Sequence, residues 1–249
     1  HELGRLPDGR TYFTMREIRG RTLKEVIQSV HAASHGGRWR AAPAGDGRPG
    51  WTFQRLLAAF QRVCEAMAYA HERGVVHRDL KPENVMVGEH GEVLVVDWGL
   101  ARVKGRPDRP AEDGALDPVV TRRSAADAAR TLMGQVMGTP AYMPPEQARG
   151  DLEQIDARSD VYALGAVLYE ILAGRAPYIG QDAQQVLDMV LAGPPDPPDR
   201  PGGAYALAQG PRLPLPGELV DICQRAMARD PAERYRDAQA LAAAVGGWM

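Results

Sequence analysis

The sequence predicts an α+β fold that combines long helices with a few short strands. Two segments, 52–73 and 159–173, carry apolar residues at helical spacing. Two β-branched runs, 85–87 and 93–96, enclose a turn-prone segment and predict a β-hairpin. The alternating segment from Thr11 to Ile18 predicts a further strand.

Composition places the chain among single globular domains. Its 249 residues are 44% hydrophobic, which is enough for one sizeable core. A net charge of -2 gives no reason to expect nucleic acid or an anionic membrane as a partner. Only Cys64 and Cys223 occur, so a reducing compartment is more natural than a disulfide framework. Since the sequence has neither a signal peptide nor an apolar run that could span a bilayer, we expect a cytoplasmic protein without a membrane segment.

The N-terminal segment and the first long helix are expected to serve the fold and not the chemistry. Residues 1–6 precede a Pro-Asp-Gly turn and predict the end of a strand before the one at 11–18. The helix from Thr52 to Arg73 is expected to pack in the core and to end at Gly74. His71 and Cys64 lie on this helix, and we assign neither a chemical role because packing accounts for both.

The helix from Ser159 to Ala173 is apolar on nearly every side, so it should be buried. Gly174 is expected to end it. Asp160, near its start, is a charge that the helix dipole favours. Two segments rich in Gly and Pro, 34–50 and 193–216, lack periodicity and are expected to be surface loops.

The most informative stretch is His77-Arg78-Asp79-Leu80-Lys81-Pro82-Glu83-Asn84, which Asp97-Trp98-Gly99 follows one hairpin later. Antiparallel pairing in that hairpin would bring Asn84 beside Asp97 at one edge of a small sheet. Their oxygens are the hard ligands that Mg²⁺ prefers. The spacing therefore predicts a magnesium site.

Asp79 and Lys81 complete the predicted site. Asp79 lies one short step before Asn84, near enough to accept a proton from a hydroxyl brought up to a metal-bound phosphate. Lys81 would offset charge on a transferred phosphoryl group. An Asp in a turn commonly just caps backbone amides, so either motif alone would be weak. The two in order, across a hairpin, indicate phosphoryl transfer.

With these motifs the sequence resembles the eukaryotic-like (Hanks-type) Ser/Thr protein kinases, particularly those of bacteria. The resemblance implies that Asp79 is the catalytic base, that Asn84 and Asp97 hold Mg²⁺, and that Lys81 contacts the γ-phosphate. ATP would be the phosphoryl donor and a protein the substrate. The implied fold is protein-kinase-like, with a helical C-terminal lobe at 19–249 and a remnant of the N-terminal lobe and hinge at 1–18.

Further residues resemble the family's structural positions. The segment from Gly138 to Glu146 resembles the one that closes a kinase activation loop, which would then run from 97 to 146. By the resemblance, Glu146 pairs with Arg234, and Asp160 holds the backbone of the catalytic loop. The structural residues implied are His77, Gly99, Glu146, Asp160 and Arg234.

The long loop carries hydroxyl side chains among several arginines. They are Thr121, Ser124, Thr131 and Thr139. Arg78, immediately before the catalytic Asp, can receive an activation-loop phosphate and fix the loop. We expect a regulatory phosphate on one of Thr121, Ser124 or Thr131, and self-association of two copies would allow autophosphorylation.

The resemblance also implies a nucleotide site. Its residues would be the gatekeeper and hinge positions, the loop lysine and the residue under the adenine ring: Met15, Arg16, Ile18, Lys81 and Met86. A Gly-rich phosphate loop, a strand Lys and its helix Glu partner are not found in the sequence, so we expect a truncated kinase with weakened catalysis by positioning. Trp98 replaces the usual Phe and could fill a similar pocket if its N–H finds a partner.

Two other functions remain open. A noncatalytic, pseudokinase-like scaffold would explain the incomplete phosphate-binding elements, although Asp79, Asn84 and Asp97 argue against evolved inactivity. A small-molecule phosphotransferase with a related core is the third hypothesis. The segment from Gly138 to Glu146 and the helix from Ser159 weigh against it, because they resemble the peptide-binding part of protein kinases.

Overall fold

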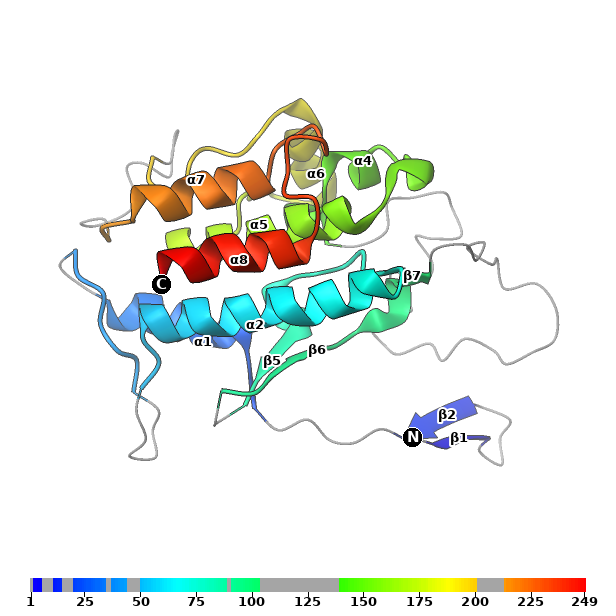
Figure 1. The fold of residues 1–249 in the computed structure, drawn as a ribbon, viewed down its shortest axis with the longest axis horizontal. Helices are drawn as coiled ribbons and strands as arrows, with labels where there is room; N and C mark the ends of the chain where they lie inside the picture. The colour runs from blue at the N-terminus through cyan, green and yellow to red at the C-terminus, as the bar shows by residue number, and fades with distance from the viewer. Residues whose placement is uncertain are drawn as a thin grey trace.

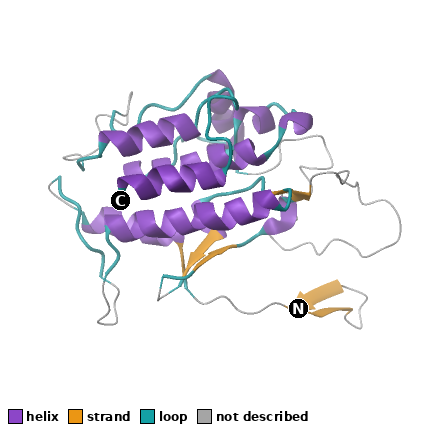
Figure 2. Ribbon diagram, viewed as in Figure 1, coloured by secondary structure: helices purple, strands orange, loops and turns teal. Residues whose placement is uncertain are grey.

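Helices form most of the described structure, and the strands form only small sheets (Figure 2). The computed structural model describes residues 2–5, 11–14, 20–34, 37–43, 50–88, 91–103, 139–200 and 213–249. This architecture agrees with the α+β prediction. The long helices stack on one another, and the three-stranded sheet lies against one side of the stack (Figure 1).

Helix α5 (Ala157–Ala173) is the centre of the core. Every residue from Ser159 to Leu172 is buried, as its uniformly apolar sequence predicts. The helix begins with a capping box. The Asp156 side chain accepts hydrogen bonds from backbone N–H groups of the first turn, and the Ser159 side chain accepts one from the backbone N–H of Asp156. It ends at Gly174, whose φ of 71° is the left-handed conformation that glycine adopts readily. Both predictions for this helix, its burial and its end, are confirmed.

Helix α2 (Phe53–Glu72) confirms the first predicted helix. Thr52 caps it by accepting a hydrogen bond from the Arg55 amide, at 3.1 Å. Its apolar face packs against the C-terminal helix α8 (Ala238–Trp248), which lies between α2 and α7 (Gly217–Ala226) in Figure 1. The hydrophobic core is therefore made by segments from both halves of the chain.

Shorter helices surround this core. They are α1 (Leu23–Ala33), α4 (Pro145–Ala148) and α6 (Ala183–Ala192), with 3₁₀ turns η1 (Pro82–Asn84), η2 (Trp98–Leu100), η3 (Pro140–Tyr142) and η4 (Leu152–Gln154). Helix α1 was not predicted from the sequence. Its signal is the capping box of Thr22 and Glu25, in which each side chain bonds the other residue's backbone N–H.

The predicted hairpin is present as strands β5 (Val85–Val87) and β6 (Val93–Val95), with Val85 opposite Val95. Strand β3 (Arg21–Thr22) extends it on the β5 side. Two further pairs are β4 (Val75–Val76) with β7 (Arg102–Val103), and β1 (Glu2–Arg5) with β2 (Thr11–Thr14). Strands are thus confirmed within both predicted segments, at 2–5 and at 11–14, while residues 15–18 of the second prediction lie outside the described residues.

The two predicted loops carry little regular structure in their described parts. Between 34 and 50, the bridge of Ala42 to Trp51 is the single ladder contact among the described residues. The described residues of 193–216 contain neither helix nor strand. Where helices are described, none is both long and apolar enough to cross a membrane.

Gly165 allows α7 to approach α5 closely, and this contact can be tested. A Cβ at Gly165 would lie 2.8 Å from both Ala226 Cβ and Met227 Cγ. Gly165→Ala should lower the free energy of unfolding by about 1–3 kcal/mol through overpacking, although alanine is intrinsically the better helix former. Urea denaturation measures the loss. The matched variant Gly217→Ala, where no atom lies within 4 Å of the new Cβ, should show none. Equal stability of the two variants would contradict this packing.

Candidate active site

The loop from His77 to Lys81 is anchored on the core by one carboxylate. The backbone N–H of His77 donates to Asp160 Oδ2 at 2.8 Å, and that of Arg78 donates to Oδ1 at 3.0 Å. Arg78 adopts a φ of 68°, in the left-handed region that non-glycine residues rarely occupy. Hydrogen bonds to a buried charge are strong enough to offset such backbone strain. Asp160 on α5 therefore determines the shape of this loop.

The same carboxylate also binds the end of α2. His71 Nε2 lies 2.9 Å from Asp160 Oδ2, and the two side chains are only 4% and 1% exposed. His71 was expected to have no chemical role, and in the structure it packs beneath the loop and supports it. Asp160 thus joins α2, α5 and the loop.

Asp79 lies at the centre of a set of hydrogen bonds. Its Oδ2 accepts from Lys81 Nζ at 2.8 Å and from Asn84 Nδ2 at 3.2 Å, and its Oδ1 accepts from the Thr139 amide at 3.0 Å. Lys81 Nζ also donates to the Thr139 hydroxyl at 2.7 Å. Thr139, which the sequence analysis grouped with the regulatory hydroxyls, therefore contacts both residues.

Asn84 and Asp97 offer oxygens suited to Mg²⁺. The Val96 amide donates to the Asn84 carbonyl at 2.9 Å. Asp97 directly follows Val96 in the sequence, so the hairpin brings the backbone of Asp97 close to that of Asn84. Asn84 Nδ2 donates to both the carbonyl and carboxylate of Asp79, which leaves the amide oxygen available for a metal. The Asp97 side chain belongs to an exposed residue in a left-handed conformation, at φ 65°.

This donor set fits Mg²⁺, which commonly takes one or two protein carboxylates and completes its shell with water and phosphate oxygens. Within the described ranges no three His, Cys, Asp or Glu side chains form a ready metal cluster. For a Mg²⁺ ion at this place, the described residues would supply one carboxylate, Asp97, and one amide oxygen, Asn84.

Met86 is the described member of the predicted nucleotide site besides Lys81. Its neighbours Val85 and Val87 are buried, whereas Met86 is half-buried on the other face of β5. It lies opposite Leu94, which is 49% exposed. The other predicted contacts, Met15, Arg16 and Ile18, lie outside the described residues.

Comparison with known proteins agrees with this geometry. Residues 11–244 match the family described as the protein kinase domain. The chain belongs to the protein kinase family. This is the family that the sequence motifs indicated.

The similar curated proteins are bacterial serine/threonine-protein kinases named PknD. That of Chlamydia abortus is 33% identical over 235 residues, covering 94% of this chain and 22% of the relative. That of Protochlamydia amoebophila is 36% identical over 167 residues, covering 67% of this chain and 16% of the relative. That of Chlamydia trachomatis serovar L2b is 31% identical over 242 residues, covering 96% of this chain and 23% of the relative. The kinase chain thus spans less than a quarter of the length of each of these relatives.

Two predictions about the kinase's loop have mixed outcomes. Trp98 Nε1 donates to the Val95 carbonyl at 3.0 Å, so the indole N–H has the partner we required. The ring nevertheless is not enclosed in a pocket, because Trp98 is 39% exposed. One side of it lies against the His77 ring, with centroids 4.6 Å apart. Gly99 follows in η2, and a Cβ there would lie 3.4 Å from Asp97 Oδ1.

The expected phosphate contact of the kinase remains a prediction. Arg78 Nε donates to the Leu100 carbonyl, which holds its side chain beside the segment after Asp97. Thr121, Ser124 and Thr131 lie outside the described residues.

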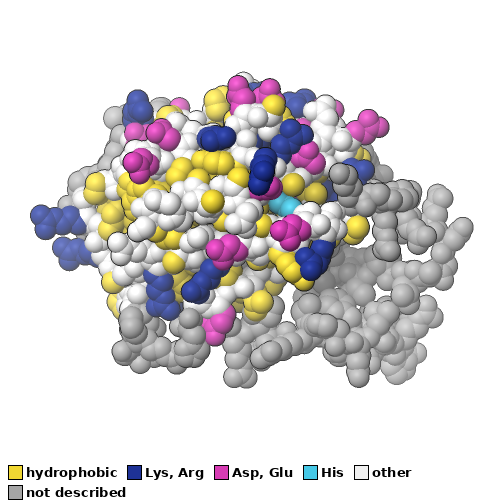
Figure 3. All heavy atoms as spheres, viewed as in Figure 1, with side chains coloured by type: hydrophobic (Ala, Val, Ile, Leu, Met, Phe, Trp, Pro, Cys, Tyr) yellow, Lys and Arg dark blue, Asp and Glu magenta, His cyan; other side chains and the backbone are white. Residues whose placement is uncertain are grey.

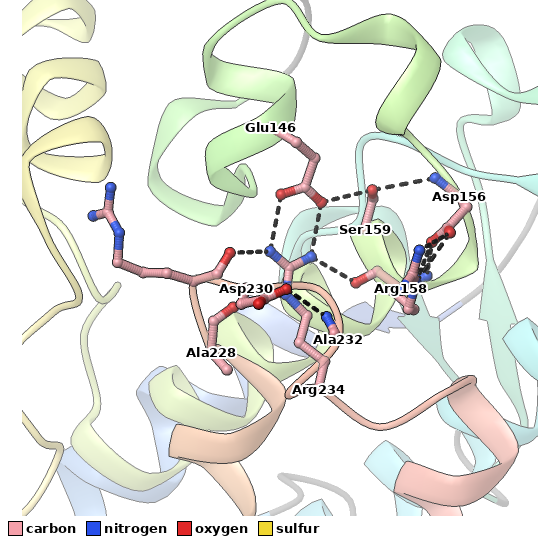
Figure 4. A network of polar contacts seen from close by, with 9 residues as sticks. Glu146, Asp156, Arg158, Ser159, Ala228, Asp230, Ala232 and Arg234 are labelled. Carbon is pink, nitrogen blue, oxygen red and sulfur yellow. Dashed lines mark hydrogen bonds and ion pairs between the residues drawn. The ribbon is translucent and has the colours of Figure 1, made fainter.

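Glu146 and Arg234 form the buried ion pair that the resemblance implied (Figure 4). Arg234 donates through two nitrogens to the two carboxylate oxygens, at 2.7 and 2.9 Å, and both side chains are fully buried. Ser159 donates to the same carboxylate at 2.8 Å. Burial alone would raise the pKa of Glu146. The hydrogen bonds and positive charge of Arg234, together with the hydrogen bond from Ser159, outweigh burial and lower this pKa.

Several residues of the kinase site escaped the sequence analysis. Gln147 Nε2 donates to the Arg78 carbonyl at 2.8 Å, and Tyr142 OH donates to Glu170, which Lys24 also contacts. Each is a common polar residue in a helix or turn, and its partner lies far away in sequence. The one available signal was the position of Gln147 next to Glu146.

Breaking the buried pair should cost far more than breaking an exposed one. Arg234→Met leaves the Glu146 carboxylate buried and unpaired, so the free energy of unfolding should fall by about 3–5 kcal/mol. Chemical denaturation at neutral pH measures it. Arg236→Met, which removes a side chain that is 83% exposed and paired with Asp237, should change stability by less than about 0.5 kcal/mol.

The pH dependence supplies a second readout of the same variants. Because the folded-state pKa of Glu146 is lowered, its contribution is complete above its ordinary value of 4.5 and is lost as the pH falls through the lower folded value. The difference between wild type and Arg234→Met should therefore narrow in acid. A difference that stays constant down to low pH would contradict the charge-based explanation.

Proposed function

We propose that this kinase chain carries the catalytic loop of a protein-serine/threonine kinase and transfers the γ-phosphoryl group of ATP to a hydroxyl of a protein. The observation that supports this most is the Asp79 carboxylate, which Lys81, Asn84 and the Thr139 amide orient together. The printed names of the relatives, serine/threonine-protein kinases, support the same acceptor chemistry.

In this proposal each residue has a separate task. Asp79 accepts the proton of the acceptor hydroxyl, and its fixed orientation saves the entropy of aligning base and acceptor. Lys81, 2.8 Å from Asp79 and 20% exposed, offsets charge on the transferred group. Asn84 and Asp97 would hold Mg²⁺, whose chemistry here is neutralisation of charge on the donor phosphates.

The remaining parts of the proposal concern nucleotide and regulation. Met86, on the open face of β5, would pack against the adenine ring, with the hinge residues Met15, Arg16 and Ile18 around it. A phosphate on Thr121, Ser124 or Thr131 would pair with Arg78 and order the loop. A noncatalytic binding module is the competing function, and the experiment below separates the two.

Asp79→Asn removes the base but keeps the size of the side chain. Phosphate transfer from ATP with Mg²⁺ to a mixed Ser/Thr peptide pool should fall by about 10²–10⁴-fold, because an amide cannot accept the proton. Radiolabelled ATP gives the rate, and circular dichroism checks the fold. Asp221→Asn, on the exposed surface of α7, is the matched control and should transfer at the wild-type rate. Equal transfer by wild type and Asp79→Asn would leave the binding module as the function.

A further inference from the structure

Arg78 directly precedes the proposed base, and both of its polar backbone groups are held by side chains. Its φ of 68° lies in the left-handed region that residues other than glycine rarely adopt. The Arg78 N–H donates to Asp160 Oδ1 at 3.0 Å, and the Arg78 carbonyl accepts from Gln147 Nε2 at 2.8 Å. Asp160 belongs to α5 and Gln147 to α4, so two separate elements hold this one strained residue.

The Arg78 carbonyl and the Asp79 N–H belong to the same peptide group. Because a peptide group is planar, a hydrogen bond to its oxygen also sets the orientation of its nitrogen. At the opposite edge of this plane, the Asp79 N–H donates to His77 Nδ1 at the longer distance of 3.3 Å. The backbone of Asp79 therefore takes its orientation from Gln147 as well as from the loop itself.

Gln147 is firmly placed within the interior. Its side chain belongs to a residue that is 5% exposed. It directly follows Glu146, whose fully buried carboxylate accepts two hydrogen bonds from Arg234. The interior that Gln147 shares with the catalytic loop leaves a void of only about 10 Å³, close to the lower limit for one water molecule. The Gln147 amide thus has little room to turn away from the loop.

The segment from Thr139 to Ala148 meets the proposed base at two points. The Thr139 amide donates to Asp79 Oδ1 at 3.0 Å, and Gln147 reaches the carbonyl just before Asp79. The first contact orients the carboxylate, and the second orients the backbone that carries it. Phosphoryl transfer depends on this alignment, because a misplacement of about 1 Å can lower a rate about 100-fold.

We propose that Gln147 is a positioning residue for the Asp79 base. The inference rests on the proposed kinase function and deepens it, since Gln147 acts through the Arg78 carbonyl and not on the reacting atoms. Removing its N–H donor should lower kcat and leave the KM values for ATP and peptide within about twofold of wild type, because Lys81, Asn84 and Asp97 stay in place.

Two variants of similar size separate the donor from the volume of the side chain. Gln147→Met has no donor at any pH, so kcat for transfer to the Ser/Thr peptide pool should fall about 10–100-fold. Gln147→Glu has no donor while its carboxyl is ionised and regains an O–H donor when it is protonated. The exposed residue of the same type in η4 gives the matched control, Gln154→Met, which should transfer at the wild-type rate.

The pH profile of Gln147→Glu is a readout that a purely structural role would not move. The charged residues that line the same interior are Arg78, Asp79 and Asp160, with Glu146 on α4 itself. Burial and the nearby carboxylates should favour the protonated form of the introduced Glu. Its kcat relative to wild type should therefore rise at least about fivefold between about pH 8.5 and pH 6, whereas the same ratio for Gln147→Met should stay constant.

Hydrogen exchange reports on the peptide group without any catalysis. In Gln147→Met the Asp79 amide should exchange at least about tenfold faster, because its peptide has lost a restraint. The amides of His77 and Arg78, which donate to Asp160, should keep their protection. A general loss of stability would instead accelerate exchange at all three amides.

Several results would overturn the proposal. They are a kcat of Gln147→Met within about threefold of wild type, a flat pH ratio for Gln147→Glu, and unchanged exchange at Asp79. If Gln147→Met does not fold, Gln147→Glu still decides, since one chain is compared with itself at two pH values. Loss of folding in both variants would assign Gln147 to the fold alone and equally overturn the positioning role.

Failure of the proposed function is a separate result. A wild-type chain that transfers no more phosphate than Asp79→Asn fails as a kinase, while faster exchange at Asp79 in Gln147→Met still supports the role of Gln147 in orienting the loop. A chain whose transfer depends on Asp79 but not on Gln147 keeps its function and loses this inference.

Discussion

The carboxylate of Asp160 is the constraint on which the candidate site depends. Buried within α5, it accepts hydrogen bonds from the amides of His77 and Arg78 and from the ring of His71. These bonds hold Arg78 in a left-handed conformation, and the turn that results places the Asp79 carboxylate against Lys81. Because α5 is buried from Ser159 to Leu172 and packs against α2, α7 and α8, the loop is attached to the most rigid part of the core.

The segment from Thr139 to Glu146 is held by three contacts, each of which satisfies a carboxylate. Thr139 binds Asp79, Tyr142 binds Glu170, and Glu146 binds Arg234. Each partner sits on a different element, so the segment, α5 and the catalytic loop form one unit. Outside these pairs, basic and acidic side chains are interspersed over the face in Figure 3, with no large region of one sign among the described residues.

The sequence predicted the elements whose signal is local. Helices α2 and α5 follow from apolar spacing with Thr52 and Gly174 at their ends, and the hairpin of β5 and β6 follows from β-branched runs around a turn. The partners of Asp160 were only partly predicted. The backbone of the catalytic loop was expected to bind it, but the sequence around His71 indicates only a packing residue, and its contact with Asp160 depends on the fold. Lys24 and Glu170 are 146 residues apart, and no local pattern marks their contact. Trp98 shows the opposite failure, because a large aromatic side chain suggests burial that the loop end does not provide.

Hydrogen exchange at the amides of His77 and Arg78 measures how firmly Asp160 holds the catalytic loop. The amides of His77 and Arg78 donate to different oxygens of Asp160. In Asp160→Asn the side chain keeps its size, but an NH₂ donor replaces one of these oxygens, so one of the two amides loses its acceptor. We expect at least about tenfold faster exchange at one or both of these amides, with protection of α5 unchanged and phosphate transfer reduced. Unchanged exchange at both amides would contradict the role of Asp160 as the anchor of the catalytic loop.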